Sequence, residues 1–181
     1  MPIPGPDQNK SRNDMRWDAL KDLVHALEEL GPAWVQTDLM LRLRHFGPGY
    51  GYSLKHLEGE FAHTDNAGPW RGPGTCPTDF DPDPLDRIVD SRRNEKWHGE
   101  RDAGVRGAWG QALETLVHEL MHDVDAPQMP WPWPEHPGIP PLGVPPPSDR
   151  DQYDGENYDR VANPIAADVL RRHEAAHGAP R

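Results

Sequence analysis

Ten of the 22 prolines in this chain lie between Ala126 and Ser148, in the segment APQMPWPWPEHPGIPPLGVPPPS. Each proline lacks an amide N–H and fixes φ, so this segment cannot form a helix interior or a central strand. We expect it to adopt polyproline II or an ordered loop that wraps around the protein. Regular structure must therefore lie before and after it.

The composition indicates one folded body with long irregular segments. The chain has 181 residues, which is the size of a single domain. Only 35% of the residues are apolar, whereas proline and glycine, with 22 and 17 residues, are abundant. We predict a flexible N-terminal tail over residues 1–12, a single domain over 13–172 that contains the proline-rich loop 126–148, and a C-terminal tail over 173–181.

The charge and the cysteine content restrict the partners and the compartment. The formal charge of −11 argues against nucleic acid, whose phosphates attract lysine and arginine and repel carboxylates. No apolar run of about 18 residues is present, and the N-terminal residues lack the apolar stretch of a signal peptide. The single cysteine, Cys76, suits a reducing compartment. We therefore expect a cytoplasmic protein with no nucleic-acid or membrane partner, and its oligomeric state stays open.

Three segments carry apolar residues at helical spacing. We predict helices over residues 13–31, with Asn13 as the N-cap, over 105–122, and over 154–178. Pro164 lies inside the last of these segments and is expected to mark a kink or a new start. These are the main elements that the pattern predicts.

Other segments are less regular. Residues 34–46 show alternating leucines typical of a strand, although Thr37 could instead cap a short helix. One helical turn is expected within 53–61, a short strand or a helix end at 86–91, and a polar loop over 91–104. The whole pattern predicts an α+β, mainly helical fold with a small sheet and long proline-rich irregular loops.

The motif H-E-L-M-H, from His118 to His122, lies in the second predicted helix. Residues i and i+4 share one helix face, so both imidazoles can bind one metal ion. Glu119 is offset so that its carboxylate reaches a metal-bound water, whose pKa Zn²⁺ lowers, and can take its proton during attack on a carbonyl. The spacing predicts a zinc site with His118 and His122 as ligands and Glu119 as general base. The alternative is two solvent-exposed histidines on a helix face.

A second H-E-x-x-H, in the sequence HEAAH, runs from His173 to His177. Arg171 and Arg172 precede it, and it has little apolar context. None of the residues that follow it in the sequence, GAPR, is expected to supply a third ligand. We interpret this copy as a solvated helix end and not as the metal site.

A catalytic zinc site needs a third protein ligand and an open position for water. The downstream candidates are Asp123, Asp125, Glu135, His136, Glu156 and Asp159. Asp123 and Asp125 directly follow the motif and lie too near the helix end for their side chains to reach back to the metal easily. His136 lies within the proline-rich loop. The sequence DRVANPIAADVL, from Asp159 to Leu170, is more informative.

H-E-L-M-H together with DRVANPIAADVL resembles the zincin metallopeptidases, and among them the gluzincin type and the ImmA/IrrE-like group. In these proteins the motif is followed by a helix of the form E-x-x-A-N-x-F-A-x-x-L-L, whose glutamate is the third ligand. The resemblance covers roughly residues 105–125 and 155–170 and implies a zincin-like active-site helix with Asp159 as the third zinc ligand. Aspartate is one methylene shorter than the family's glutamate, and Pro164 interrupts the helix pattern. Glu156, one turn earlier, is the alternative ligand.

Several further residues could serve such a site. Zincins often add a donor that stabilises the oxyanion, and the sequence does not choose among Tyr153, Tyr158 and His98. Trp131 and Trp133 could line a substrate cleft, but we favour a role in covering the core. The proline-rich loop could also dock into the aromatic groove of a partner protein.

The leading hypothesis is a small zinc-dependent metallopeptidase that acts on a peptide or protein substrate of unknown identity. The alternative is a non-catalytic zinc-binding structural or protein-interaction protein, of a phage or mobile-element type, with a zincin-like fold. A third possibility is a helical interaction module in which H-E-L-M-H is accidental.

Overall fold

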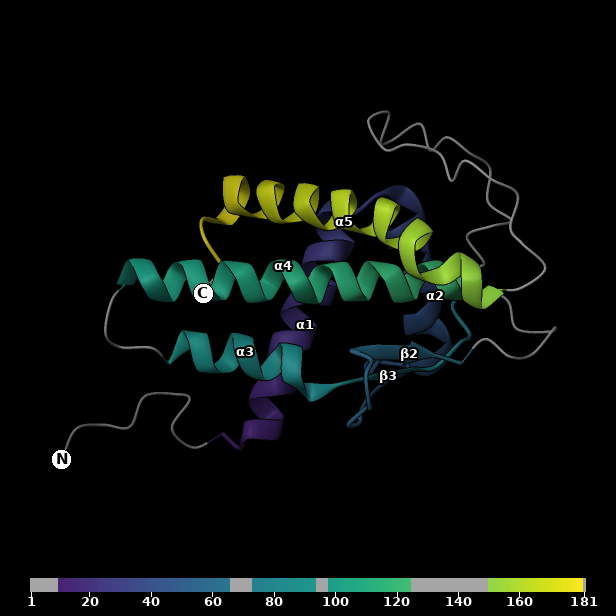
Figure 1. Ribbon diagram of the computed structural model, residues 1–181, viewed down its shortest axis with the longest axis horizontal. Helices are drawn as coiled ribbons and strands as arrows, with labels where there is room; N and C mark the ends of the chain where they lie inside the picture. Colours follow the sequence, from purple (N-terminus) through teal and green to yellow (C-terminus); the bar gives the residue numbers. More distant parts are fainter. Residues whose placement is uncertain (1–9, 66–72, 94–97, 125–149, 181) are drawn as a thin grey trace.

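The computed structural model describes residues 10–65, 73–93, 98–124 and 150–180, without the side chains of 98–102 and 150–157. Over these ranges, five helices pack against one another and beside a small three-stranded sheet (Figure 1). The predicted α+β, mainly helical fold is therefore confirmed. The proline-rich loop lies outside the described residues.

The first two helices, α1 (Arg12–Leu30) and α2 (Ala33–Phe46), follow each other directly in the chain. Ser11, and not the predicted Asn13, caps α1 with its side chain. α2 is the segment for which a strand or a helix was expected, and Thr37 lies inside it. Its buried residues recur at helical spacing, so packing against the core selects the helix over the strand that the leucines suggest.

The sheet consists of β1 (Tyr52–Leu54), β2 (Ala62–Thr64) and β3 (Thr78–Phe80). β3 lies in the middle, parallel to β1 and antiparallel to β2. The helical turn expected within 53–61 is wrong, because β1 begins this stretch and no helix follows before β2. Pairing with β3 gives these backbone groups hydrogen bonds that one isolated helical turn would leave unmade.

Two helices follow the sheet, α3 (Pro82–Arg92) and α4 (His98–Asp123). Asp81 caps α3 and a proline opens its first turn, which is where proline is best tolerated in a helix. Of the two alternatives for 86–91, the helix is therefore correct. The loop expected over 91–104 is wrong at both ends, since α3 enters it and α4 begins within it.

The last helix, α5 (Arg150–His177), continues through Pro164, whose side chain is exposed. Gly178 ends the helix with φ +81°, and its amide donates to the Glu174 carbonyl. Residues 173–177, expected to begin a C-terminal tail, form the last turn of α5 and belong to the folded body.

α4 is the central element of the fold. It packs along α5 on one side and against α3 and β2 on the other, while α1 crosses behind it (Figure 1). Its second half contains Leu113, Leu116, Val117, Leu120 and Met121, all completely buried. Side chains buried around most of its circumference identify α4 as a core helix, and H-E-L-M-H lies at its C-terminal end. None of the helices in the described ranges is both long and apolar enough to cross a lipid bilayer.

Candidate metal centre

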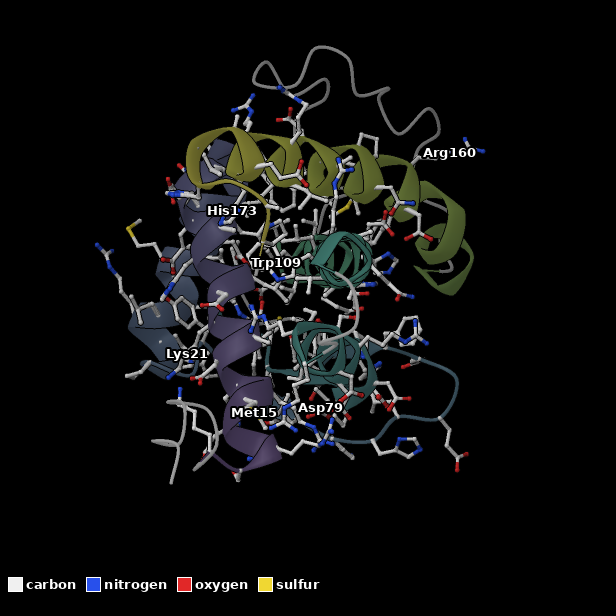
Figure 2. All side chains as sticks on the ribbon, turned by 90° about the vertical axis from the view of Figure 1, so that its left-hand side faces the viewer. Met15, Lys21, Asp79, Trp109, Arg160 and His173 are labelled. Atoms are coloured by element: carbon white, nitrogen blue, oxygen red, sulfur yellow. The ribbon has the colours of Figure 1, made fainter. Side chains whose placement is uncertain are left out.

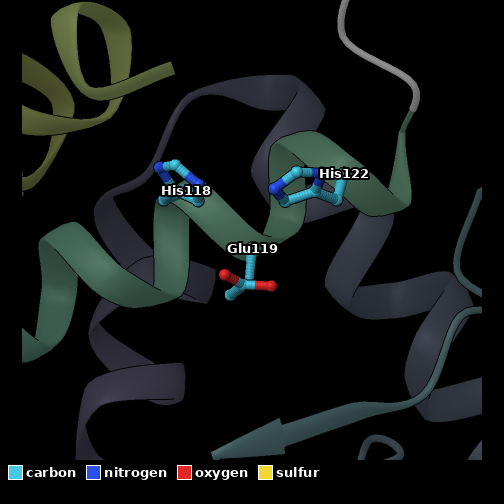
Figure 3. A group of neighbouring side chains, drawn as sticks. All are labelled: His118, Glu119 and His122. Carbon is cyan, nitrogen blue, oxygen red and sulfur yellow. The ribbon is translucent and has the colours of Figure 1, made fainter. Parts of the chain in front are cut away.

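α4 brings the three key residues of H-E-L-M-H together. The imidazole rings of His118 and His122 lie on one side of the helix with centroids 5.1 Å apart, and Glu119 projects from another side (Figure 3). Potential ligand atoms of all three residues lie within 4.8 Å of one another. Among the described residues, this group has the spacing that binding a metal ion requires.

α5 places two residues against this histidine pair. The Tyr158 ring is buried and contacts both imidazoles, with centroids 5.5 Å from His118 and 4.8 Å from His122. Asp159 lies at the surface, with a carboxylate oxygen 2.9 Å from Nδ1 of His118. The residue predicted as third ligand is thus brought beside the first histidine by the packing of α5 on α4.

The contact between His118 and Asp159 allows two roles for the carboxylate. A hydrogen bond at this contact would require the proton on Nδ1 of His118, because an ionised carboxylate only accepts, and Nε2 would then be the nitrogen open to a metal. A metal bound at Nε2 would have Asp159 as the partner that orients the imidazole. A metal bound at Nδ1 would instead meet Asp159 as a ligand.

The donor set fits zinc. Two imidazoles and a neighbouring carboxylate are the ligand types that Zn²⁺ takes in catalytic sites, whereas Ca²⁺ and Mg²⁺ select oxygen ligands. His118 and His122 would hold the ion, and Asp159 is the described carboxylate on α5 that would complete or orient the set.

The side chain of Glu119 is held in place by a hydrogen bond from a residue of the sheet. Glu119 is only 6% exposed, and Oε2 accepts a hydrogen bond from the Thr64 hydroxyl at 2.6 Å. Thr64 ends β2 and also contacts the hydroxyl of Thr78 on β3 at 3.0 Å. A buried carboxylate needs such partners to offset the loss of water. β2 therefore fixes the direction in which the Glu119 carboxylate points.

A buried arginine continues this network. Arg42 is completely buried, and its guanidinium donates to Thr78 Oγ1 at 3.1 Å and to Asp123 Oδ2 at 3.1 Å. The same side chain donates to the carbonyls of Tyr50 and Cys76. A continuous chain of contacts runs from Arg42 through Thr78 and Thr64 to Glu119. The candidate base and the end of α4 are thus tied to the same arginine.

Asp123 explains how the end of α4 is anchored. Besides Arg42, its carboxylate accepts from the amides of Gly74 at 3.2 Å and Cys76 at 3.1 Å. Gly74 has φ +77°, and a Cβ there would lie 2.3 Å from Cβ of Leu41, so a side chain cannot be accommodated. Asp123, one of the sequence candidates for third ligand, is directed into the protein and serves as an anchor.

Two further ionisable groups lie in this buried cluster. Burial and the neighbouring Asp123 carboxylate raise the pKa of Asp38 to about 9, so Asp38 is protonated at neutral pH. Burial raises the pKa of Tyr52 to about 12, and the Arg42 guanidinium lies 4.5 Å from its ring centroid. The carboxylate of Asp123, 3.1 Å from the guanidinium, is the ion-pair partner of Arg42 in this cluster.

The second H-E-x-x-H is less solvated than the sequence indicates. His173 is partly buried, with its ring 4.9 Å from that of Trp109, and this burial lowers the pKa of the imidazole. Glu174 pairs with Arg106 of α4, and Nε2 of His177 lies 2.9 Å from a carboxylate oxygen of Glu29. Interpreting this copy as a solvated helix end is therefore wrong for His173 and Glu174, because α5 packs here against both α4 and α1.

Several sequence candidates fall outside what the structure describes. Glu156, the alternative ligand, lies on α5 one turn before Asp159, but its side chain is not among those described. The same holds for the side chains of Tyr153 and His98. Glu135, His136, Trp131 and Trp133 lie within the proline-rich loop and outside the described residues.

The sequence did not identify the residues that hold Glu119. Thr64, Thr78 and Arg42 come from β2, β3 and α2, three elements far from the motif in the chain. Only Arg42 had a recognisable signal, since it lies on the helical face that also carries Trp34 and Leu39. A charged residue on an apolar helix face indicates a buried partner.

Comparisons with models of protein families, with curated proteins and with solved structures find no match to this chain. The zincin resemblance therefore depends on the motif and on the helix that faces it.

Proposed function

We propose that this protein is a zinc-dependent hydrolase, most simply a small metallopeptidase, with His118 and His122 as metal ligands. The main support is the histidine pair on a rigid core helix, with the Glu119 carboxylate within 4.8 Å of both potential ligand atoms. Further support comes from α5, which brings Asp159 within 2.9 Å of His118. Zinc bound there would supply a Lewis acid that makes water more acidic and polarises a carbonyl group.

The protein's own residues have distinct roles in this proposal. Glu119 takes the proton of the attacking water as general base and passes it to the leaving amine. Thr64 holds the Glu119 carboxylate by a hydrogen bond of 2.6 Å, so that no reorientation is needed during reaction. The Tyr158 ring packs against both imidazoles and restricts their rotation.

Asp159 is the proposed third ligand, with Glu156 as the alternative. The carboxylate of Asp159 already lies at a distance from Nδ1 of His118 that is close to the separation of two ligands on one zinc ion, roughly 3.3 Å for tetrahedral angles. Glu156 precedes it by one helical turn on α5.

A non-catalytic zinc-binding protein is the second candidate. The observation that favours it is the burial of Glu119, which is only 6% exposed and already bonded to Thr64. A base that must meet water and substrate is more often accessible, whereas a buried carboxylate can serve simply to position the metal-binding helix. Its zinc would then stabilise the fold or a protein interface. We infer a cytoplasmic setting for either candidate, since a chain with a single cysteine cannot form an internal disulfide and suits a reducing compartment.

Elemental analysis of protein purified without added metal, followed by hydrolysis assays with a fluorescent casein and a peptide library, tests the proposal. We expect zinc in the purified wild type, its loss from the His118→Ala, His122→Ala variant, and zinc-dependent cleavage. Zinc without cleavage of any peptide would favour the non-catalytic candidate. Absence of zinc binding at His118 and His122 would overturn both.

A further inference from the structure

The second H-E-x-x-H borders a pocket that the proposed function does not use. This pocket, of about 600 Å³, lies where the end of α5 meets α1 and α4. Its polar lining includes His25 and Glu29 from α1 and His173 and His177 from α5. In Figure 2, His173 on α5 and Trp109 on α4 lie close together beside α1. Three histidines and two carboxylates, Asp22 and Glu29, thus line this pocket from two helices.

The histidine pair in this pocket has the same geometry as the pair at the candidate centre. The ring centroids of His173 and His177 lie 4.9 Å apart, compared with 5.1 Å for His118 and His122. Nδ1 of His173 is buried and has no hydrogen-bond partner. A buried polar nitrogen without a partner is costly, and a metal ion is one way to satisfy it.

A carboxylate from a different helix completes the set. Both oxygens of Glu29 lie near Nε2 of His177, at 2.9 and 3.1 Å. Two ligand atoms on one tetrahedral zinc ion are separated by roughly 3.3 Å, so a small displacement would let an ion enter between them. The side chains of His177 and Glu29 are 47% and 52% exposed, so they are able to rotate to include His173.

We propose that His173, His177 and Glu29 form a second binding site for zinc, which links the end of α5 to α1. His25 lies one helical turn before Glu29 and can act as a fourth ligand from the same face of α1.

This second site is structural and not catalytic. Glu174, which occupies the position of a general base, forms an ion pair with Arg106 of α4 and is therefore engaged away from an incoming water. Four protein ligands also leave no open position, which is typical of structural zinc. The ion would hold the last turn of α5 to α1 and would strengthen the contact between the exposed side chains of His177 and Glu29.

The two sites can be separated by counting zinc. Full-length protein is equilibrated with zinc, dialysed against a metal buffer and analysed for zinc per chain. We expect two zinc ions in the wild type, one in His118→Ala, His122→Ala, and one in His173→Ala, His177→Ala. His45→Ala, which removes an exposed histidine of α2, is the matched control and should retain two.

Two further measurements make the result decisive. In the His118→Ala, His122→Ala background, zinc at a hundredfold excess over Kd should raise Tm by about 5–10 °C. Glu29→Gln should weaken that binding at least tenfold. An equal zinc content in the wild type and in the double variant His173→Ala, His177→Ala would overturn the second site. An unchanged zinc affinity in Glu29→Gln would also overturn it.

A cobalt titration covers the case in which the first double variant does not fold. Cobalt absorption is then recorded for the wild type and for His177→Ala, and a drop from two equivalents to one supports the second site, whereas unchanged binding overturns it. Failure of the proposed hydrolase would appear differently. If no metal binds at His118, the wild type should bind one equivalent of cobalt and His177→Ala should bind none.

Discussion

The chain contains two H-E-x-x-H sequences whose histidines have nearly the same geometry. The ring centroids are 5.1 Å apart in the first copy and 4.9 Å apart in the second. In each copy a carboxylate from another helix lies 2.9 Å from a histidine nitrogen, namely Asp159 beside His118 and Glu29 beside His177. The histidine spacing and the facing carboxylate therefore do not distinguish a catalytic site from a structural one.

The glutamate between the histidines is where the copies differ. Glu119 is buried and accepts from a neutral hydroxyl, that of Thr64, whereas Glu174 pairs with the charged Arg106. The first copy also has its ligand atoms already within 4.8 Å, while the second needs exposed side chains to rotate. A helix can present two histidines at any position, but a base needs a surrounding structure that holds it without occupying it. The following predictions test this difference.

Replacement of each of the two glutamates by glutamine should separate the two copies of the motif most clearly. Glu119→Gln keeps the shape and the hydrogen bond to Thr64 but cannot accept a proton, so we expect kcat to fall about 10³-fold. Zinc content should be unchanged. Glu174→Gln, the matched variant, should retain wild-type kcat. Equal loss of activity in both variants, or none in Glu119→Gln, would contradict the assignment of the base.

The anchoring of the two helix ends should differ in stability. Asp123→Ala leaves Arg42 buried without its charged partner, and we expect a loss of about 3–5 kcal/mol in the free energy of unfolding. Arg106→Met breaks the more exposed pair with Glu174 and should cost less than about 1 kcal/mol. Urea unfolding followed by circular dichroism measures both. Similar losses in the two variants would show that the buried pair has no special role.

Substitution of the carboxylates on α5 should identify the third ligand. If Asp159 binds the ion, Asp159→Ala should weaken zinc binding more than about 100-fold, which is the upper range for a residue that only orients a ligand. A loss of about 10–100-fold would make it the orienting partner of His118, and loss confined to Glu156→Ala would select the alternative. Competition with a chromophoric chelator measures these affinities. Unchanged affinity in both variants would exclude α5 as the source of a ligand.

The sequence predicted those parts of the molecule that local pattern controls. The helix containing His118 and the fold class follow from apolar periodicity, because a stripe at helical spacing can be buried in only one way. The nearness of Asp159 to His118 was predicted from the zincin resemblance, and the packing of α5 on α4 agrees with it.

What the sequence could not provide are contacts between distant segments. α2 shows the problem, because its leucines alternate as in a strand and only burial of Arg42 and its neighbours selects the helix. The environment of Glu119 is a second case, since Thr64 approaches it through the packing of β2 on α4. The setting of the second H-E-x-x-H was also misjudged, because nothing near His173 in the sequence indicates Trp109.

The buried cluster beneath the first copy should make stability depend on pH in a way that the second copy does not. Asp38 has a pKa of about 9 in the folded protein and about 3.9 when unfolded, so the folded state holds an extra proton between these values. Stability should therefore fall as pH rises through this window, because the folded state must give up the extra proton. Asp38→Asn should flatten the profile measured by urea unfolding from pH 6 to 9. Parallel profiles for wild type and variant would contradict this.

Removal of the Thr64 hydroxyl should give the smallest effect and the most specific one. Thr64→Val keeps the shape of the side chain but removes the donor to Glu119, so the carboxylate loses its fixed direction while zinc binding is preserved. We expect kcat to fall about tenfold, equivalent to about 1.4 kcal/mol, with unchanged KM and zinc content. Thr64→Ser retains a hydroxyl and should recover most of the rate. A full rate in Thr64→Val would mean that burial alone orients Glu119, and the contrast with Glu174 would then depend on Arg106 and not on β2.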